Sequence, residues 1–188
     1  MAGDDIPANG PQAVLAFWFD EITPKQWWAK SDDFDRLIEH RFGATHAAAE
    51  RCELAHWRDS AQGRLAEVIV LDQFSRNIYR NQPRSFASDP LALALAQTAV
   101  ATGADQQLDV TRRVFLYMPY MHSESARIHS AAVQLFSAAD MPPDNLAFEL
   151  RHRAIIERFG RYPHRNAILA RSSTAEEIEY LAMPGSSF

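Results

Sequence analysis

The apolar stretch over residues 65–77 reads LAEVIVLDQFSRN, and it indicates the fold class. The residues spaced by three and four positions, which would share one face of an α-helix, are Leu65, Val68, Ile69 and Asp72. We therefore predict a helix over residues 61–74. Asp72 falls on its apolar face, where a carboxylate needs a partner, and Arg76 follows four residues later in the favourable acid-first order.

Helix signals also dominate the rest of the chain. Capping residues and prolines mark further helices from Ser31 to about residue 49, from Asp89-Pro90, from Asp109, over about 125–139 and 145–159, and from Thr174. Pro119 is expected to interrupt the helix that begins at Asp109. Gly160 is expected to end the helix over about 145–159. Runs rich in β-branched residues between turn signals are missing. We predict an all-α fold, an array of about eight antiparallel helices on short loops.

Length and composition indicate one globular domain. The chain has 188 residues, of which 47% are hydrophobic, so it can bury a sizeable core without a disulfide or metal. We expect a flexible tail over residues 1–11, a single helical domain over 12–183 and a frayed end over 184–188. The net charge of −5 argues against nucleic-acid partners, and no apolar run is long enough for a membrane helix. With one cysteine and no secretory leader pattern, we expect a soluble, cytoplasmic protein.

Three polar segments follow strongly apolar runs and are therefore candidates for a shared site. They cover residues 72–77, 122–124 and 158–166. Polar groups at the edge of a core are costly unless they are paired, which favours contacts between the segments. In the third segment, arginines at 158, 161 and 165 surround His164, and such forks suit a carboxylate, a phosphate or an internal acid.

Two histidines are candidates for acid–base chemistry. His152 shares a predicted helix face with Phe148 and Ile155, so its imidazole should point inward, either as a core residue or as a proton-transfer group. Glu149 precedes it in a Glu-x-x-His spacing, but no second such pair supports a metal site. His122 stands before Ser123, a natural helix N-cap. Nucleotide-binding loops, zincin motifs and paired cysteines are all missing, so we predict no metal and no cofactor.

Five stretches together are similar to the bacterial domain of unknown function 924 family, and they cover residues 14–19, 70–77, 87–92, 115–124 and 158–166. The resemblance extends over about residues 13–182. It implies an all-helical, tetratricopeptide-like array of antiparallel helix pairs, and it implies no reaction. Two departures stand out: Ser75 occupies a position where the family usually has proline, and residues 125–131 differ from the family's Asp-Leu…Gln-Glu-Arg pattern.

These observations give one leading hypothesis and two alternatives. The leading hypothesis is a polar cavity that binds a small anionic ligand or a peptide carboxylate. Its candidate binding residues are Asp72, Gln73, Arg76, Asn77, His122, Ser123, Glu124, His152, His164, Arg165 and Asn166. The first alternative is a hydrolase whose catalytic candidates are His122, Glu124, His152 and Asp72. The second is a protein–protein scaffold in which the polar motifs only join helices.

Overall fold

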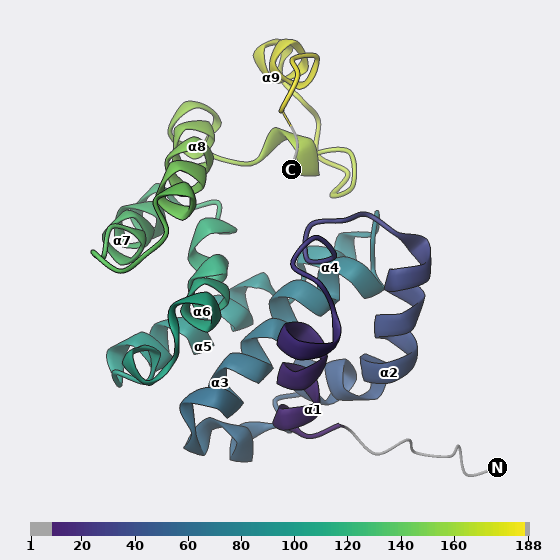
Figure 1. Ribbon diagram of the computed structural model, residues 1–188. Helices are drawn as coiled ribbons and strands as arrows, with labels where there is room; N and C mark the ends of the chain where they lie inside the picture. The colour runs from purple at the N-terminus through teal and green to yellow at the C-terminus, as the bar shows by residue number, and fades with distance from the viewer. Residues whose placement is uncertain (1–8, 187–188) are drawn as a thin grey trace, which may run out of the picture.

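The computed structural model describes residues 9–186, and every regular element within that range is helical (Figure 1). The α-helices are α1 (Pro11–Ala16), α2 (Asp32–Glu50), α3 (Ala61–Ile69), α4 (Ser75–Ile78), α5 (Asp89–Ala101), α6 (Val110–Met121), α7 (Ala126–Phe136), α8 (Pro143–Phe159) and α9 (Ala175–Leu181). Shorter 3₁₀ or π-helical turns cover Phe17–Glu21, Ala55–Asp59, Val70–Phe74, Pro83–Phe86, Asp105–Gln107 and Pro163–Arg165. The all-α prediction is confirmed.

Several predicted helix ends are confirmed by their capping contacts. The Ser31 and Asp109 side chains each accept the main-chain N–H three residues ahead, at 3.3 and 3.0 Å. Thr174 and Glu177 form a reciprocal capping box at the start of α9. Gly160 closes α8 with a φ of +70°, a left-handed conformation that glycine adopts without a Cβ penalty.

Other predicted ends were wrong. Pro119 lies inside α6 and does not interrupt it: the helix continues to Met121, and the single main-chain hydrogen bond that proline removes is lost only two residues before that end. Asp89 is the first helical residue of α5 and not its cap, since its carboxylate is drawn to arginines instead. Ser123 does not cap α7, because that helix starts at Ala126 and its N-cap residue is Ser125.

A π-helical turn, Val70–Phe74, joins α3 to α4 into one continuous helical segment. Such a turn widens the helix and removes the usual four-residue hydrogen bonds from its carbonyl groups. Two side chains bond to carbonyl groups of this turn. The Ser75 hydroxyl donates to the Leu71 carbonyl at 2.6 Å, and the Arg76 guanidinium donates to the Asp72 carbonyl at 2.8 Å. Asp72 is therefore presented at a widened turn, a position where helices often carry functional groups.

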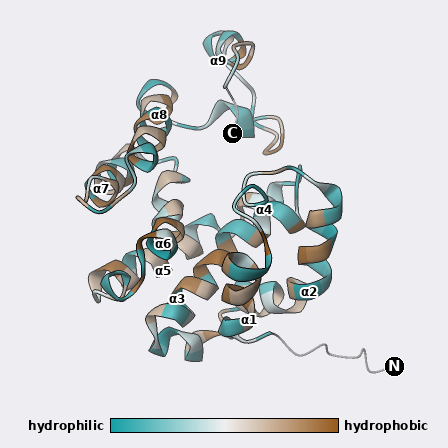
Figure 2. Cartoon of the chain, viewed as in Figure 1, coloured by the Kyte–Doolittle hydropathy of each residue, from teal (hydrophilic) through white to brown (hydrophobic). Residues whose placement is uncertain are grey.

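The main core lies where α1, α2, α3, α5 and α6 pack together. Its largest rings touch each other: the Phe74 centroid lies 4.9 Å from that of Phe42 and 5.5 Å from that of Trp18. Figure 2 shows hydrophobic residues concentrated on α3 and its neighbour α1. A second, smaller apolar cluster forms around Ile155, Ile156 and Tyr162 near the end of α8. The two cores leave a junction between them, and the polar segments meet there.

Later helices pack in chain order, α5 on α6, α6 on α7 and α7 on α8. Figure 1 shows α7, α8 and α9 extending away from the block formed by α1 to α4. Across the described part of the chain, each helix is too short or too polar to cross a membrane.

The described ends of the chain are attached to the fold. Within the predicted tail, residues 1–11, the Asn9 N–H donates to the Thr45 hydroxyl at 2.8 Å and Pro11 begins α1, and the flexibility of the tail stays a prediction. Near the other end, the Ser186 hydroxyl donates to the Leu181 carbonyl at 3.1 Å, so the predicted fraying of 184–188 is not seen there. Residues 1–8 and 187–188 lie outside the described range. The single domain over 12–183 stays a prediction.

Candidate functional site

Asp72 is the buried centre of the candidate site. Its Oδ1 accepts from His122 Nδ1 at 2.7 Å and from Arg76 Nη1 at 3.0 Å, and its Oδ2 accepts from Gln73 Nε2 at 2.6 Å. The residue is 1% exposed. Burial raises the pKa of Asp72, but the charge of Arg76 and the hydrogen bonds from His122 and Gln73 outweigh it and lower the pKa to about 2. Asp72 is therefore an ionised acid. Its bonds to Arg76 and His122 supply the partners that a carboxylate on an apolar helix face needs.

A second carboxylate joins two arginines from distant segments. Arg76 donates to both oxygens of Asp89, at 2.9 and 3.0 Å, and Arg165 Nη1 donates to Asp89 Oδ2 at 3.3 Å. Arg165 Nη2 also donates to the His122 carbonyl, at 3.0 Å. The three polar segments identified in the sequence thus converge, with α5 supplying the acid that connects them.

Two aromatic rings pack against the Arg165 guanidinium. Its guanidinium carbon lies 4.5 Å from the Phe86 centroid and 4.7 Å from the Tyr162 centroid. Burial and the nearby Arg76 charge lower the pKa of Arg165, yet a guanidinium stays protonated in proteins. The Nε–H of this buried side chain has no acceptor among the described residues. Arg165 is therefore a fixed cation with one unused donor.

His122 has a defined tautomer. Because Asp72 is ionised, the ring nitrogen that faces it, Nδ1, must carry the proton. Burial and the charge of Arg76 lower the pKa of His122, against the opposing effect of Asp72. The ring is therefore neutral near pH 7, and its Nε2 carries a lone pair. This atom has no hydrogen bond to any described residue, so it is available as an acceptor or a base.

A cavity of about 400 Å³ lies against these groups. Its lining residues come from the 83–93 segment, from the end of α6 and the turn after it, and from the segment after α8: Pro83, Phe86, Ala87, Asp89, Pro90, Leu93, Pro119, His122, Ser123, Glu124, Arg165 and Leu169. Most of the wall is apolar, and a few polar groups converge at it. That composition is typical of small-molecule sites.

Glu124 lines the same cavity but belongs to a separate ion pair. Its carboxylate accepts from Arg171 at 2.6 and 2.9 Å and from the Tyr162 main-chain N–H at 2.8 Å. Burial raises the pKa of Glu124, but the bonds from Arg171 and the Tyr162 main chain lower it by more, so the pKa ends below its ordinary value. The carboxylate fastens the segment after α8 to the turn before α7.

His152 is buried on the inner side of α8, as its spacing predicted, although it does not line the cavity. Its Nδ1 bonds to the Phe148 carbonyl at 2.8 Å, and burial lowers its pKa to about 3. Phe148 was expected on the same inner face, but its side chain is half exposed. Glu149 points to His129, with 2.7 Å between Oε1 and Nδ1, so the Glu-x-x-His pair is split between different partners. In the described range, no group of three or more His, Cys, Asp or Glu side chains could hold a metal.

Other predicted binding residues lie away from the cavity, because their side chains satisfy structural contacts. Asn77 donates to Asp35 Oδ1 at 2.8 Å on the α2 side. Asn166 donates to the Ser173 hydroxyl at 3.0 Å, facing α9. Gln73 lies behind Asp72 and is not a lining residue.

His164 is beside Tyr162, with ring centroids 5.5 Å apart, and burial together with the Arg165 charge lowers its pKa to about 4. It does not line the cavity. Of the arginines that surround it in sequence, Arg158 and Arg161 pair with Glu176 and Glu177. Arg158 and Arg161 therefore bind internal acids, which was one of the alternatives that the sequence left open. Of the three arginines, Arg165 is the one that lines the cavity.

Sequence reasoning missed several residues that complete the site. Asp89 was interpreted only as a helix start, and nothing in its local pattern pointed to two arginine partners. Phe86 and Arg171 stand in polar loop sequence that gave no signal. His129 did carry one, since it lies three residues before buried Ala132 and seven before buried Phe136, on the apolar face of α7.

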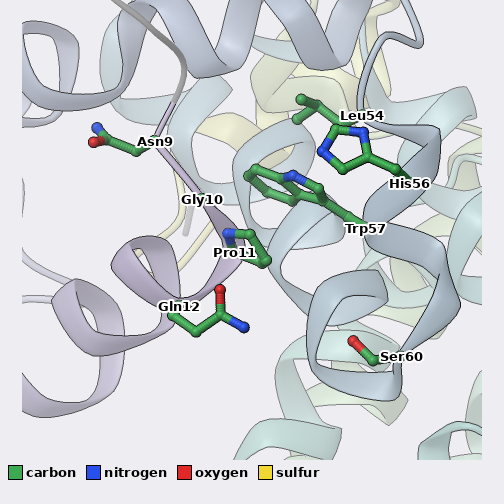
Figure 3. Close-up of a pocket in the computed structure, with 8 residues that line it drawn as sticks. All are labelled: Asn9, Gly10, Pro11, Gln12, Leu54, His56, Trp57 and Ser60. Atoms are coloured by element: carbon green, nitrogen blue, oxygen red, sulfur yellow. The ribbon is translucent and has the colours of Figure 1, made fainter.

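A second hollow, of about 380 Å³, lies between the start of α1 and the turn at Ala55–Asp59 (Figure 3). It is lined by Asn9, Gly10, Pro11, Gln12, Leu54, His56, Trp57 and Ser60. Ser60 already caps α3 by accepting the Gly63 N–H at 3.0 Å. This hollow holds no carboxylate or guanidinium group, so the cavity at His122 is the stronger candidate.

Comparisons with known proteins agree with the fold but assign no activity. The profile of a family described as "Bacterial protein of unknown function (DUF924)" matches residues 14–185. A solved structure of a protein of unknown function from Agrobacterium tumefaciens is similar, with a TM-score of 0.87 and 38% sequence identity. The match covers 92% of this chain and 96% of that one. The search of curated proteins finds no match.

Proposed function

This chain belongs to the DUF924 family of bacterial proteins of unknown function, and we propose that it binds a small anionic ligand or a peptide carboxylate in the cavity beside His122. The observation that carries the proposal is the wall formed by Arg165 and His122. Arg165 brings a rigid, charged side chain to this wall, with its guanidinium packed against Phe86 and Tyr162. A guanidinium held in this way is well suited to bind a carboxylate.

The acids at the cavity do not oppose this proposal strongly. Asp89 is engaged by Arg76 and Arg165, and Glu124 is engaged by Arg171, so each carboxylate is already neutralised by guanidinium groups. The remaining wall is largely apolar and would pack against the body of a ligand. The size of the cavity, about 400 Å³, fits a ligand of a few residues or a small metabolite.

The proposal is tested with an acetylated tripeptide that has a free carboxylate and with the same tripeptide as its C-terminal amide. Calorimetry should show binding of the acid form only. Arg165→Gln should weaken binding by about tenfold to a hundredfold, the equivalent of one charge-assisted hydrogen bond. Arg158→Gln, which removes a surface arginine that pairs with Glu176, is the matched control and should bind normally. Equal affinity in wild type, both variants and the amide would refute carboxylate recognition.

The arrangement of Asp72 and His122 favours hydrolysis as a second candidate function. A buried carboxylate that fixes Nδ1–H leaves Nε2 as a base toward the cavity, which is the arrangement used for general-base catalysis. Glu124 is engaged by Arg171 and by the Tyr162 main-chain N–H, so we infer that water is the group that His122 would activate.

This candidate predicts a simple result in a screen of ester and amide substrates. Turnover should be lost in His122→Asn, whose amide can still donate to Asp72, and should persist in His40→Asn on exposed α2 surface. Turnover that survives in His122→Asn would exclude His122 as the base.

We also propose the tetratricopeptide-like arrangement that the family resemblance implies, and a cytoplasmic location. The packing of α6 on α7 and of α7 on α8 supports the first. A single, unpaired cysteine, Cys52, supports the second, since reducing compartments keep thiols free. A scaffold role remains a further hypothesis, and the structural pairing of Asn77 and Asn166 is the feature that it would explain.

A further inference from the structure

The groups that face His122 have formal charges that cancel. Asp72 and Arg76 come from the segment that joins α3 to α4, Asp89 comes from α5, and Arg165 follows α8. Two carboxylates and two guanidiniums therefore give no net charge around the imidazole. The neighbouring pair of Glu124 and Arg171 also cancels, and His152 and His164 are neutral near pH 7 because burial holds their pKa values far below.

A carboxylate that Arg165 held in this cavity would bring one negative charge beyond those that the two arginines already balance. The charges nearest to it are largely buried, since Asp72 is 1% exposed and Arg165 is 6% exposed. An unbalanced charge in such surroundings is costly. A neutral His122 would add a second problem, because its Nε2 lone pair would face an acceptor oxygen of the ligand.

Protonation of His122 at Nε2 removes both problems. It supplies one positive charge, and it converts Nε2 from an acceptor into a donor. Nδ1 already carries its proton, so Nε2 is the position left for another, and Asp72 at 2.7 Å stabilises the resulting imidazolium. In the empty cavity, Arg76 and Arg165 oppose this charge; a bound anion would offset them.

We infer that ligand binding takes up one proton at Nε2 of His122, and that the cavity therefore selects a singly charged carboxylate over a doubly charged phosphate. The inference rests on the proposed binding function and specifies the class of ligand. A dianion would need a second proton, and arginines hold the pKa values of Asp72 and Glu124 below their ordinary range.

The test measures proton uptake during binding. The acetylated tripeptide acid is titrated into the full chain by calorimetry, at one pH and in two buffers of different ionisation enthalpy. The expected uptake is close to one proton per peptide, with an affinity that rises by up to about tenfold for each pH unit lowered between pH 8 and 7. His122→Asn should bind with no proton uptake, whereas His40→Asn should match wild type. Inorganic phosphate at pH 8 should bind at least tenfold more weakly than the peptide.

The outcomes separate this inference from the function on which it rests. Peptide binding without proton uptake would overturn the inference and leave the binding function intact. Unchanged uptake in His122→Asn would place the proton elsewhere and would also overturn it. Phosphate that binds as tightly as the peptide would overturn the selectivity for monoanions. The absence of any binding by wild type would overturn both the inference and the proposed function.

Discussion

Asp72→Asn should destabilise the fold by an amount that follows from the pKa of the carboxyl. The amide keeps the size of the side chain but removes the charge that Arg76 and His122 face. A pKa lowered from 3.8 to about 2 corresponds to about 2.4 kcal/mol of stability, at about 1.4 kcal/mol per pKa unit. Arg76 keeps its two bonds to Asp89, which limits the additional cost of breaking a buried pair. We therefore expect a loss of about 2–3 kcal/mol in unfolding free energy.

The assay is urea unfolding at pH 8, where His122 is neutral in both proteins. The lowered pKa means that the Asp72 contribution is fully present above pH 3.8 and is lost as the pH falls toward 2, so pH 8 samples all of it. The melting temperature should fall by about 5–10 °C for a chain of this size. Asp33→Asn is the control, because it breaks an exposed pair with Arg36 and should change little. If Asp72→Asn were no more destabilising than Asp33→Asn, the assignment of Asp72 as a buried, ionised carboxylate bonded to several side chains would be refuted.

Three further predictions concern groups around the site. Tyr162→Phe removes a buried hydroxyl that donates to the Met121 carbonyl at 2.5 Å, and it should lower the unfolding free energy by about 1–3 kcal/mol in urea; unchanged stability would contradict that bond. Ser75→Ala removes the hydroxyl that bonds to His46 Nε2 and to the π-turn carbonyl, both at 2.6 Å, and it should cost about 1–2 kcal/mol, whereas a neutral result would mean that the π-turn does not need this bond. The pKa of His164 is lowered to about 4, so its contribution to stability is complete above pH 6.5 and is lost as the pH falls toward 4. Over this range, the loss of unfolding free energy with falling pH should be shallower in His164→Asn, by at most about 1.4 kcal/mol per pH unit. Identical slopes would contradict a buried neutral imidazole.

The fold could be predicted from the sequence because its signals are local. The spacing around Asp72 and the caps at Ser31, Asp109 and Thr174 each depend on neighbouring residues alone, and they are confirmed. The π-turn at Val70–Phe74 could not be predicted, because the bonds from the Ser75 hydroxyl and Arg76 to its carbonyl groups depend on side chains already placed in three dimensions. The resemblance to proline-bearing relatives at position 75 was the nearest hint, since proline also removes a main-chain bond.

The site was predicted in part, and the missing part has a physical reason. Residues with charge and apolar neighbours, such as Asp72, His122 and Arg165, were found because burial of a charge demands a partner. The identity of that partner is a tertiary fact. Asp89 and Phe86 lie on a segment whose sequence reads as an ordinary turn and helix start, and their importance comes only from the approach of Arg165. Amides such as Asn77 were included in the site because they share a motif with Asp72, but a helix turns them to a different face.

The most direct test of the proposed site is whether ligand binding changes the protonation of the His122 ring. Long-range nitrogen NMR of the histidine side chains at pH 7 reports which ring atoms carry protons. We predict that His122 carries a proton on Nδ1 alone in the free protein, and on both ring nitrogens once the tripeptide acid is bound. A ring protonated on Nε2 before ligand is added, or one unchanged by saturating peptide, would contradict it.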